Sequence, residues 1–389
     1  MAIEHSNSCS TLVSLDDVQK IGQEQDCYQK APSYVRTNIV LPNDDCFDED
    51  EADSYDISTQ CEQHLYLPSI DEEAVDICLR SIPQIMESAD ELLANPPRHF
   101  TTSSRERLLY VGQGEVAYVT PQHCDVIASD KATTCHILAL RSTSERGPMV
   151  SLTHIDGVGF ESCIRNMIQE HKLFHADGEE KKQEYDMDDR INIDVHIMGG
   201  FEDDDESSRS ISNFLMHLLA RIALEESHEI TVTLKTCAIS SINDNGHGCP
   251  IGRGLGVSIK TGEAFLAKVD NAVAGPSPNL RSARLWSGNG GKKLSTIHSH
   301  SSDKMFVQPF RFAHLKQMES LVTLPDSLLL EYTSTSPDVE EGDFCDSVRS
   351  TLSFMRKVKC ESVFGSECRR PAIFVRVGTT NQWKLTTQF

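Results

Sequence analysis

The order in which short strands and helices follow one another most constrains the fold of this 389-residue chain. From Arg107 to His154, apolar and polar residues alternate over short runs, which is typical of half-buried strands. We expect Arg107 to Thr120 to form a hairpin of two strands around Gly112-Gln113-Gly114. Single amphipathic helices are then predicted between strands, because apolar side chains recur at helical spacing over 160–168 and 211–222. This grouping differs from regular βαβ alternation. We therefore expect an α+β fold, a layered β-sheet core with flanking helices.

The N-terminal stretch differs in composition from the rest of the chain. Residues 1–60 hold 13 Asp and Glu against 3 Lys and Arg, so they contribute −10 of the net charge of −23. The run from Asp44 to Glu51 is almost entirely acidic and offers little apolar surface to bury. We expect residues 1–60 to be an acidic, disordered extension and residues 61–389 to form one domain. The segment 177–189 reads as a charged insertion in that domain.

Charge, hydropathy and cysteine usage exclude several classes of protein. A net charge of −23 argues against nucleic acid or an anionic membrane as partner, because both require clustered Lys and Arg. The chain contains no run of 18 apolar residues and no basic, apolar leader at Met1–Ser10. The 13 cysteines are odd in number and form no CxxC pair. We expect reduced thiols and a location in the cytoplasm or the nucleus.

Familiar cofactor motifs are incomplete. The glycines at 252, 254 and 256 lack the dinucleotide-binding spacing, and Gly288 to Lys292 lacks the pattern of a phosphate-binding loop. His298 and His300 place two imidazoles on one strand face, half of a metal site, but no zinc-binding spacing accompanies them. We expect no cofactor. A metal-dependent hydrolase using these two histidines remains an alternative.

A cysteine and a histidine offer a more specific chemistry. Cys135 begins an apolar strand, and His154 follows 19 residues later at the end of the next strand. If the two strands are neighbours, the ends meet, and the imidazole can activate the thiol as a nucleophile. The second imidazole nitrogen then needs a partner that fixes the ring, for which Ser129, Asp130 and Asp156 are candidates. His136 should point to the opposite face of the strand and serve the structure.

An ordered set of motifs supports this site. From Leu108 onward the chain resembles the protein N-terminal asparagine amidohydrolase family, whose members deamidate N-terminal Asn in the Arg/N-degron pathway. The resemblance rests on Ser129-Asp130, Ala132-Thr133-Thr134-Cys135-His136, Leu152-Thr153-His154, Asp156-Gly157, Val195-His196, Gly199-Gly200-Phe201-Glu202-Asp203, Ser334-Thr335-Ser336-Pro337 and Arg349-Ser350-Thr351-Leu352. It implies a thiol nucleophile at Cys135. The arrangement also resembles bacterial chemoreceptor deamidases and deamidating toxins, and this analogy places Ser129 in a triad with Cys135 and His154.

The resemblance also implies a substrate and partners. Cys135 would attack the side-chain amide of an N-terminal Asn, with backbone N–H groups near Thr134 and Cys135 stabilising the oxyanion. A carboxylate would bind the α-ammonium group of the substrate, and Asp130, Asp156 and Glu115 are candidates. The expected partners are proteins or peptides with free N-terminal Asn and, downstream, an arginyltransferase and a ubiquitin ligase. An adaptor that binds such N-termini without catalysis is the alternative.

Overall fold

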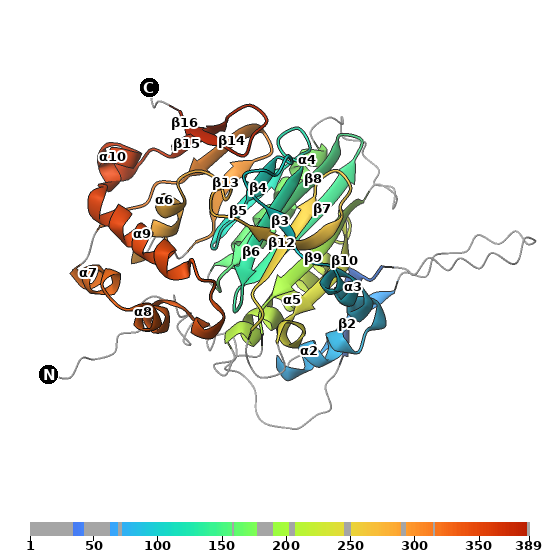
Figure 1. The fold of residues 1–389 in the computed structure, drawn as a ribbon. Helices are drawn as coiled ribbons and strands as arrows, with labels where there is room; N and C mark the ends of the chain where they lie inside the picture. The colour runs from blue at the N-terminus through green and yellow to red at the C-terminus, as the bar shows by residue number, and fades with distance from the viewer. Residues whose placement is uncertain are drawn as a thin grey trace, which may run out of the picture.

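The computed structural model describes residues 34–42, 63–68, 72–157, 159–176, 190–201, 207–244, 250–288, 293–313 and 316–386. Within this part of the chain the strands form two β-sheets, and helices pack around them (Figure 1). The acidic run at 44–51 and the charged segment at 177–189 lie outside the described residues. The architecture is a mixture of large sheets and several helices, which agrees with the expected α+β class.

The larger sheet has eleven strands in the described residues. In spatial order they are β16 (Trp383–Leu385), β15 (Ala372–Arg376), β14 (Ser302–Val307), β13 (Ser295–Ser299), β5 (Glu115–Val119), β8 (Gly147–Ile155), β7 (His136–Ser144), β9 (Ile191–Gly199), β10 (Ile230–Ile239), β1 (Tyr34–Val40) and β2 (His64–Pro68). The smaller sheet has the order β3 (Arg98–Phe100), β12 (Ala264–Val269), β11 (Arg253–Ser258), β6 (Val126–Ala132) and β4 (Leu108–Tyr110).

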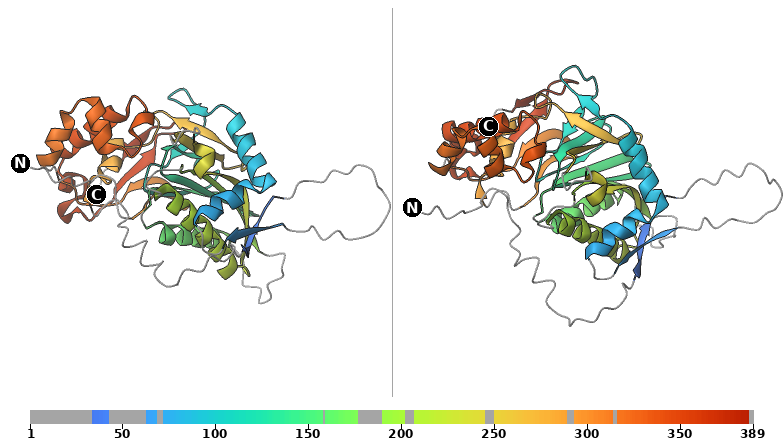
Figure 2. Two further views of the ribbon diagram at one scale, coloured as in Figure 1. Left: turned by 90° about the horizontal axis from the view of Figure 1, so that it is seen from below. Right: turned by 60° about the horizontal axis from the view of Figure 1, so that its bottom comes forward.

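The helices form two groups. The first comprises α2 (Glu72–Arg80), α3 (Pro83–Ala94), α4 (Phe160–Ala176), α5 (Ser207–Glu225) and the 3₁₀ helix η2 (Ser240–Asn243). The second comprises α6 (Pro278–Ala283), α7 (Lys316–Val322), α8 (Asp326–Thr333), α9 (Phe344–Lys357) and α10 (Cys360–Phe364), with the 3₁₀ helices η4 (Pro337–Val339) and η5 (Ser366–Cys368). Figure 2 shows this C-terminal group, in orange and red, gathered on one side of the molecule and away from α2.

The strand β7 divides the hydrophobic core into two parts. Ile137 and Ala139 face a core that the two sheets share with the C-terminal helices, here called the inter-sheet core. Leu138 and Leu140 face the opposite way, into a core formed with α2, α4 and α5, here called the helix-side core. Because successive side chains of a strand point to opposite faces, every residue of β7 and β8 can be assigned to one of these cores.

Most predicted elements are confirmed, but their pairing differs in places. We expected 107–120 to form a hairpin around Gly112–Gly114, and this is wrong: β4 pairs with β6 in the smaller sheet, whereas β5 pairs with β8 and β13 in the larger one. Residues 34–40, which we assigned to the extension, form β1 and pair with β10. The two parallel strands β9 and β10 are joined through α5, so the fold does contain one βαβ unit.

In the part of the chain that the structure describes, none of the helices has both the length and the apolar character that crossing a membrane requires.

Candidate active site

Cys135 lies in the short connection between β6 and β7, one residue before β7 begins. Of the eight cysteines in the described part of the chain, seven are buried, and Cys135 alone keeps intermediate exposure. Its side chain packs against the inter-sheet core. Since a reactive thiol must be reached by its substrate, this exposure distinguishes Cys135 from the structural cysteines.

His154 faces the same core from the neighbouring strand. β7 and β8 pair antiparallel, with Ile137 opposite His154 and His136 opposite Ile155. Cys135 lies just before β7 and packs against the same inter-sheet core as Ile137, so Cys135 and His154 lie on one side of the larger sheet. The expected adjacency of the two strands is thus confirmed.

Ser129 approaches His154 from the other sheet. It lies in β6, is fully buried, and its Oγ is 2.7 Å from Nδ1 of His154. Ile127, two residues earlier on the same strand, belongs to the inter-sheet core, which shows that this face of β6 looks toward the larger sheet. The hydrogen bond therefore joins the two sheets and leaves Nε2 as the second functional nitrogen of the ring.

Burial determines the resting charge of both groups. It lowers the pKa of His154 to about 4, although the nearby Glu115 carboxylate acts in the opposite direction. Burial of the sulfur raises the pKa of Cys135 well above its usual range, and the negative charges of Asp156 and Glu340 add to this effect. A hydrogen bond from Thr134 lowers the pKa of the thiol but is outweighed. At neutral pH the thiol and the imidazole are therefore both uncharged.

Two glycines fix the backbone next to Cys135. The Gly200 N–H donates to the Cys135 carbonyl oxygen at 2.9 Å. Gly199 and Gly200 have φ values of +114° and +70°, in the region that favours glycine. A Cβ on Gly199 would overlap the Cys135 carbonyl oxygen, and one on Gly200 would meet the His136 ring at 2.5 Å. The Gly-Gly pair at the end of β9 thus lets the chain pass directly against the turn that carries the thiol.

The structure brings Thr134 and Asp156 to the thiol. Asp156 follows directly after β8, and its negative charge raises the pKa of the Cys135 thiol. Thr134 hydrogen-bonds the thiol through its side chain, and its Oγ1 is 3.2 Å from Oγ1 of Thr335. Both residues therefore lie at the candidate site.

Asp130 is placed elsewhere. Its carboxylate accepts hydrogen bonds from the Tyr110 hydroxyl at 2.9 Å and from the Val269 N–H at 2.8 Å. On the strand it alternates with Ser129 and shares the face of Ala128, which belongs to a separate core on the outer side of the smaller sheet. The structure thus assigns this carboxylate to partners within the smaller sheet and does not bring it to Cys135.

Glu115 lies near His154 but is paired with an arginine. Its side chain is 3% exposed and forms a two-pronged ion pair with Arg281, whose Nε lies 2.9 Å from the carboxylate. The Gly112 N–H donates a third bond at 2.8 Å. Burial alone would raise the pKa of Glu115, but Arg281 and Arg284 hold it below its usual range. The carboxylate is therefore ionised and paired with Arg281. It acts on His154 electrostatically, through its negative charge.

The structure adds residues that the sequence analysis did not select. Thr335 and Glu340 belong to the segment between α8 and α9, and both lie close enough to Cys135 or Thr134 to interact with them. Burial raises the pKa of the half-buried Glu340 carboxyl, while its hydrogen bond with Ser334 and the charge of Lys131 lower it. The motif from Ser334 to Pro337 could have indicated this segment, because it is one of the motifs that carry the family resemblance, although the sequence analysis assigned it no role. Arg281 had no signal, because it is 166 residues from Glu115.

His136 and His298 are both buried and have partners within the fold. His136 is fully buried on the helix side, where Nε2 lies 2.7 Å from the Ser212 hydroxyl of α5, as its strand position predicted. Nδ1 of His298 lies 2.8 Å from the Tyr118 carbonyl oxygen. Within the described residues, the single cluster with the spacing of metal ligands is Cys360, Glu361 and Cys368, so His298 and His300 do not form one. His247 and Cys249 lie outside the described residues.

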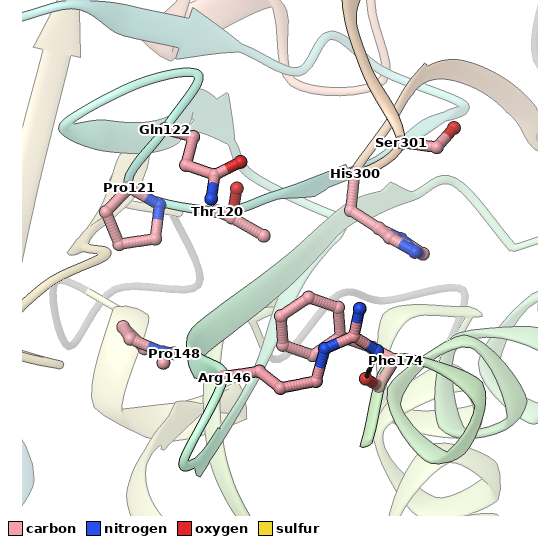
Figure 3. Close-up of a pocket in the computed structure, with 9 residues that line it drawn as sticks. Thr120, Pro121, Gln122, Arg146, Pro148, Phe174, His300 and Ser301 are labelled. Atoms are coloured by element: carbon pink, nitrogen blue, oxygen red, sulfur yellow. Dashed lines mark hydrogen bonds between the residues drawn. The ribbon is translucent and has the colours of Figure 1, made fainter. Parts of the chain in front are cut away.

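A cavity of about 440 Å³ lies at the other end of β8, beside Gly147 and Pro148 (Figure 3). Its lining includes the side chains of Arg146, Phe174 and His300 but no cysteine, Asp or Glu. Seven residues of extended strand separate Gly147 from His154, which corresponds to roughly 20 Å. The cavity therefore has no part in the cysteine–histidine site.

Fold and site together define an α+β protein with a candidate thiol–imidazole hydrolase site between two sheets. The sequence profile of the protein N-terminal asparagine amidohydrolase family matches residues 98–385. The chain is 31% identical over 253 residues to the protein N-terminal asparagine amidohydrolase of Sus scrofa, covering 64% of this chain and 75% of the pig protein. For the Homo sapiens protein of that name the identity is 30% with the same coverage, and for the Arabidopsis thaliana protein it is 24% over 313 residues, 73% of this chain and 82% of the relative. The chain belongs to the protein N-terminal asparagine amidohydrolase family.

Proposed function

We propose that this protein is a cysteine-dependent amidohydrolase that converts the side chain of an N-terminal asparagine to aspartate and releases ammonia. One observation carries the proposal: Ser129 holds His154 through a 2.7 Å hydrogen bond, on the sheet face that Cys135 shares. The family to which the chain belongs supports the reaction and the substrate, since its named relatives are N-terminal asparagine amidohydrolases.

The proposed chemistry uses one thiol and one imidazole. Sγ of Cys135 attacks Cγ of the asparagine side chain while Nε2 of His154 takes the thiol proton. The tetrahedral oxyanion is stabilised by backbone N–H groups at Thr134 and Cys135. His154 returns the proton to the leaving nitrogen, so that ammonia departs and a thioester remains. A water molecule deprotonated by His154 then attacks the thioester, which releases aspartate and restores the thiol.

The resting state supports general-base catalysis. Because the pKa of His154 is lowered to about 4 and that of Cys135 is raised, the pair is uncharged before the substrate binds. The thiol proton then moves during the attack instead of beforehand. Ser129 orients the ring without adding charge, and the charged Glu115 nearby stabilises the imidazolium that forms.

The free amino group of the substrate has a specific role in this site. Asp156 and Glu340 both raise the pKa of the Cys135 thiol through their negative charge. We propose that these two carboxylates bind the α-ammonium group, because their negative charges both act on the thiol that attacks the substrate. An ammonium group bound there offsets the two charges, which lowers the pKa of the thiol and makes the substrate part of its own activation. An acetylated N-terminus supplies no such charge.

The proposed reaction also suggests related enzymes and a pathway that uses its product. By the resemblance to the chemoreceptor deamidases and deamidating toxins, we propose that Cys135, His154 and Ser129 act together as a triad, which the hydrogen bond between Ser129 and His154 supports. An N-terminal aspartate is the product, and we propose that it passes to an arginyltransferase and a ubiquitin ligase of the Arg/N-degron pathway, in the cytoplasm or nucleus.

The direct test is ammonia release from peptides that begin with Asn, Gln or acetylated Asn. We expect release from the Asn peptide alone. The Gln side chain is longer than that of Asn by one methylene, and acetylation removes the positive charge of the α-amino group. Cys135→Ser should abolish release, whereas Cys163→Ser, which changes a buried cysteine on the helix-side core, should leave it intact. Full activity of a folded Cys135→Ser variant would refute the thiol mechanism. Binding of the Asn peptide to the unaltered protein without ammonia release would instead identify an adaptor.

A further inference from the structure

Two cysteines outside the candidate active site lie in contact. Sγ of Cys368 is 2.6 Å from Sγ of Cys360, and both residues are buried, at 9% and 7% exposure. Cys360 begins α10 and Cys368 ends η5, in the C-terminal group of helices (Figure 1). Neither residue belongs to the motifs that define the family resemblance.

The backbone between the two cysteines is bent to bring them together. Gly365 and Glu367 have φ values of +75° and +67°, and Cys368 itself has a φ of +50°. For a residue other than glycine this left-handed region costs free energy, so it persists only where the surroundings enforce it. Phe364, at the centre of the turn, is fully buried and contacts the Phe310 ring edge-on, with 5.2 Å between ring centroids. The burial of Phe364 therefore fixes the turn, and the turn places the thiols.

The separation of the sulfur atoms distinguishes between possible roles. The two thiols lie within hydrogen-bond distance of each other, so they are in direct contact. Two thiolates that share a tetrahedral zinc ion, with Zn–S bonds of about 2.3 Å, would be roughly 3.8 Å apart. A bonded pair is about 2.05 Å apart. Although the exposed carboxylate of Glu361 lies within 4.8 Å of both sulfurs, the distance between the sulfurs favours a covalent bond over a shared metal.

We propose that Cys360 and Cys368 form a reversible disulfide by exchange with a small-molecule disulfide such as oxidised glutathione. In the first step one protein thiolate attacks a glutathione sulfur, which forms a mixed disulfide and releases one glutathione thiol. In the second step the other protein thiolate attacks the protein sulfur of the mixed disulfide and releases the second glutathione thiol. The two protein thiols are oxidised, the glutathione disulfide is reduced, and the two protons pass to the two glutathione thiolates.

The bond would act on the C-terminal part of the fold. It closes the short loop that contains Phe364 and lies just before β15, which pairs with β14 of the larger sheet. Cross-linking a loop of this size restricts the unfolded chain and stabilises the native one. We expect the oxidised protein to melt about 5 °C higher than the reduced protein.

Mass spectrometry of the full-length protein tests the proposal. The protein is equilibrated with reduced or oxidised glutathione, unfolded in urea with N-ethylmaleimide, and digested with trypsin. The tryptic peptide 360–369 holds both cysteines and has no internal Lys or Arg. After oxidised glutathione it should lack two hydrogen atoms and carry no maleimide. After reduced glutathione it should carry two maleimide groups.

Three variants complete the test. Cys360→Ser and Cys368→Ser should each abolish both the loss of two hydrogens and the melting difference. Cys345→Ser, which changes a buried cysteine of α9, should leave both unchanged. Two maleimide groups on the peptide after oxidised glutathione would overturn the proposal. One zinc ion per chain that protects both thiols until a chelator removes it would overturn it as well, in favour of a metal site.

Discussion

The hydrogen bond between Ser129 and His154 is the most consequential contact at the scale of single residues. It connects the two sheets and fixes the orientation of the imidazole. In Ser129→Ala the ring loses its partner and can rotate, so Nε2 is no longer held in the orientation that the proposed proton transfer with Cys135 requires. We expect kcat/KM for the Asn peptide to fall about 100-fold, the lower end of what a positioned general base contributes. Steady-state ammonia release measures the effect.

A second serine provides the matched control. Oγ of Ser151 lies 2.9 Å from Nε2 of His171, equally buried but on the helix side of the sheet. Ser151→Ala therefore leaves a buried imidazole nitrogen unpaired, as Ser129→Ala does, at a cost of about 1–3 kcal/mol in each case. The two variants should lose similar stability, and only Ser129→Ala should lose activity. Equal activity of the two would contradict the role of Ser129.

Glu115 illustrates a charge whose removal affects both stability and catalysis. In Glu115→Gln the buried Arg281 loses its counter-charge, and breaking a buried ion pair on one side costs about 3–5 kcal/mol. The pKa of His154 should also fall further, because Glu115 raises it. Urea unfolding measures the first effect, and the acid limb of the pH–rate profile measures the second. The double variant Glu115→Leu with Arg281→Met should recover part of the stability, and no recovery would contradict the charge-based explanation.

At the scale of elements, the turn before β7 depends on the end of β9. Gly199→Ala would place a Cβ against the Cys135 carbonyl oxygen, in a backbone conformation with φ of +114°. Gly147, the first residue of β8, has a similar φ of +97°, but a Cβ added there would meet no atom within 4 Å. Gly147→Ala thus reports backbone strain alone, about 1–2 kcal/mol. Gly199→Ala should lose more stability than this and also most of the ammonia-releasing activity. Activity equal to that of Gly147→Ala would show that the contact with Cys135 is unimportant.

The elements also show how far a sequence can predict this fold. Alternation identified β7 and β8, and their short connection made them neighbours, so the shared face of Cys135 and His154 followed from local information. Alternation carries no information about which sheet a strand joins, which is why β4 and β5 were taken for a hairpin. The strand β1 was missed for a related reason: its pairing with β10 and β2 is distant in sequence, and the acidic composition around it obscured it.

At the scale of the whole molecule, the candidate site exists only because two sheets meet. Ser129 comes from the smaller sheet, His154 from the larger one, Cys135 from the connection between them, and Glu340 from the segment between α8 and α9. The sequence motifs pointed to Ser129, Cys135 and His154, because each of these residues lies within a short motif that can be recognised locally. The distant partners of Asp130 and Glu115 could not be predicted, since Val269 and Arg281 are more than 130 residues away from them. The sequence therefore predicts the reactive groups better than the residues that hold them.

Four buried histidines make the stability of the whole protein depend on pH. Burial lowers the pKa to about 3 for His136 and His171 and to about 4 for His154 and His196. In the unfolded chain these groups titrate near 6.5. Below pH 6.5 the unfolded state therefore binds protons that the folded state does not, so stability falls with falling pH until the folded pKa values are reached. Each histidine contributes about 1.4 kcal/mol at pH 5.5, so the four together should lower the free energy of unfolding by about 5 kcal/mol between pH 7.5 and 5.5.

Urea unfolding at several pH values checks this prediction, and one variant isolates a single histidine's contribution. His171→Gln removes a buried imidazole that lies away from the candidate site, between Ser142 and Ser151. We expect the variant to be less stable at neutral pH. Its loss of stability between pH 7.5 and 5.5 should be smaller than that of the unaltered protein by about 1.4 kcal/mol, because its unfolded state binds one proton fewer. His228→Gln changes an exposed imidazole and serves as the matched control. If His171→Gln and His228→Gln have the same pH dependence as the unaltered protein, burial of neutral histidine is not what sets the acid sensitivity of the fold.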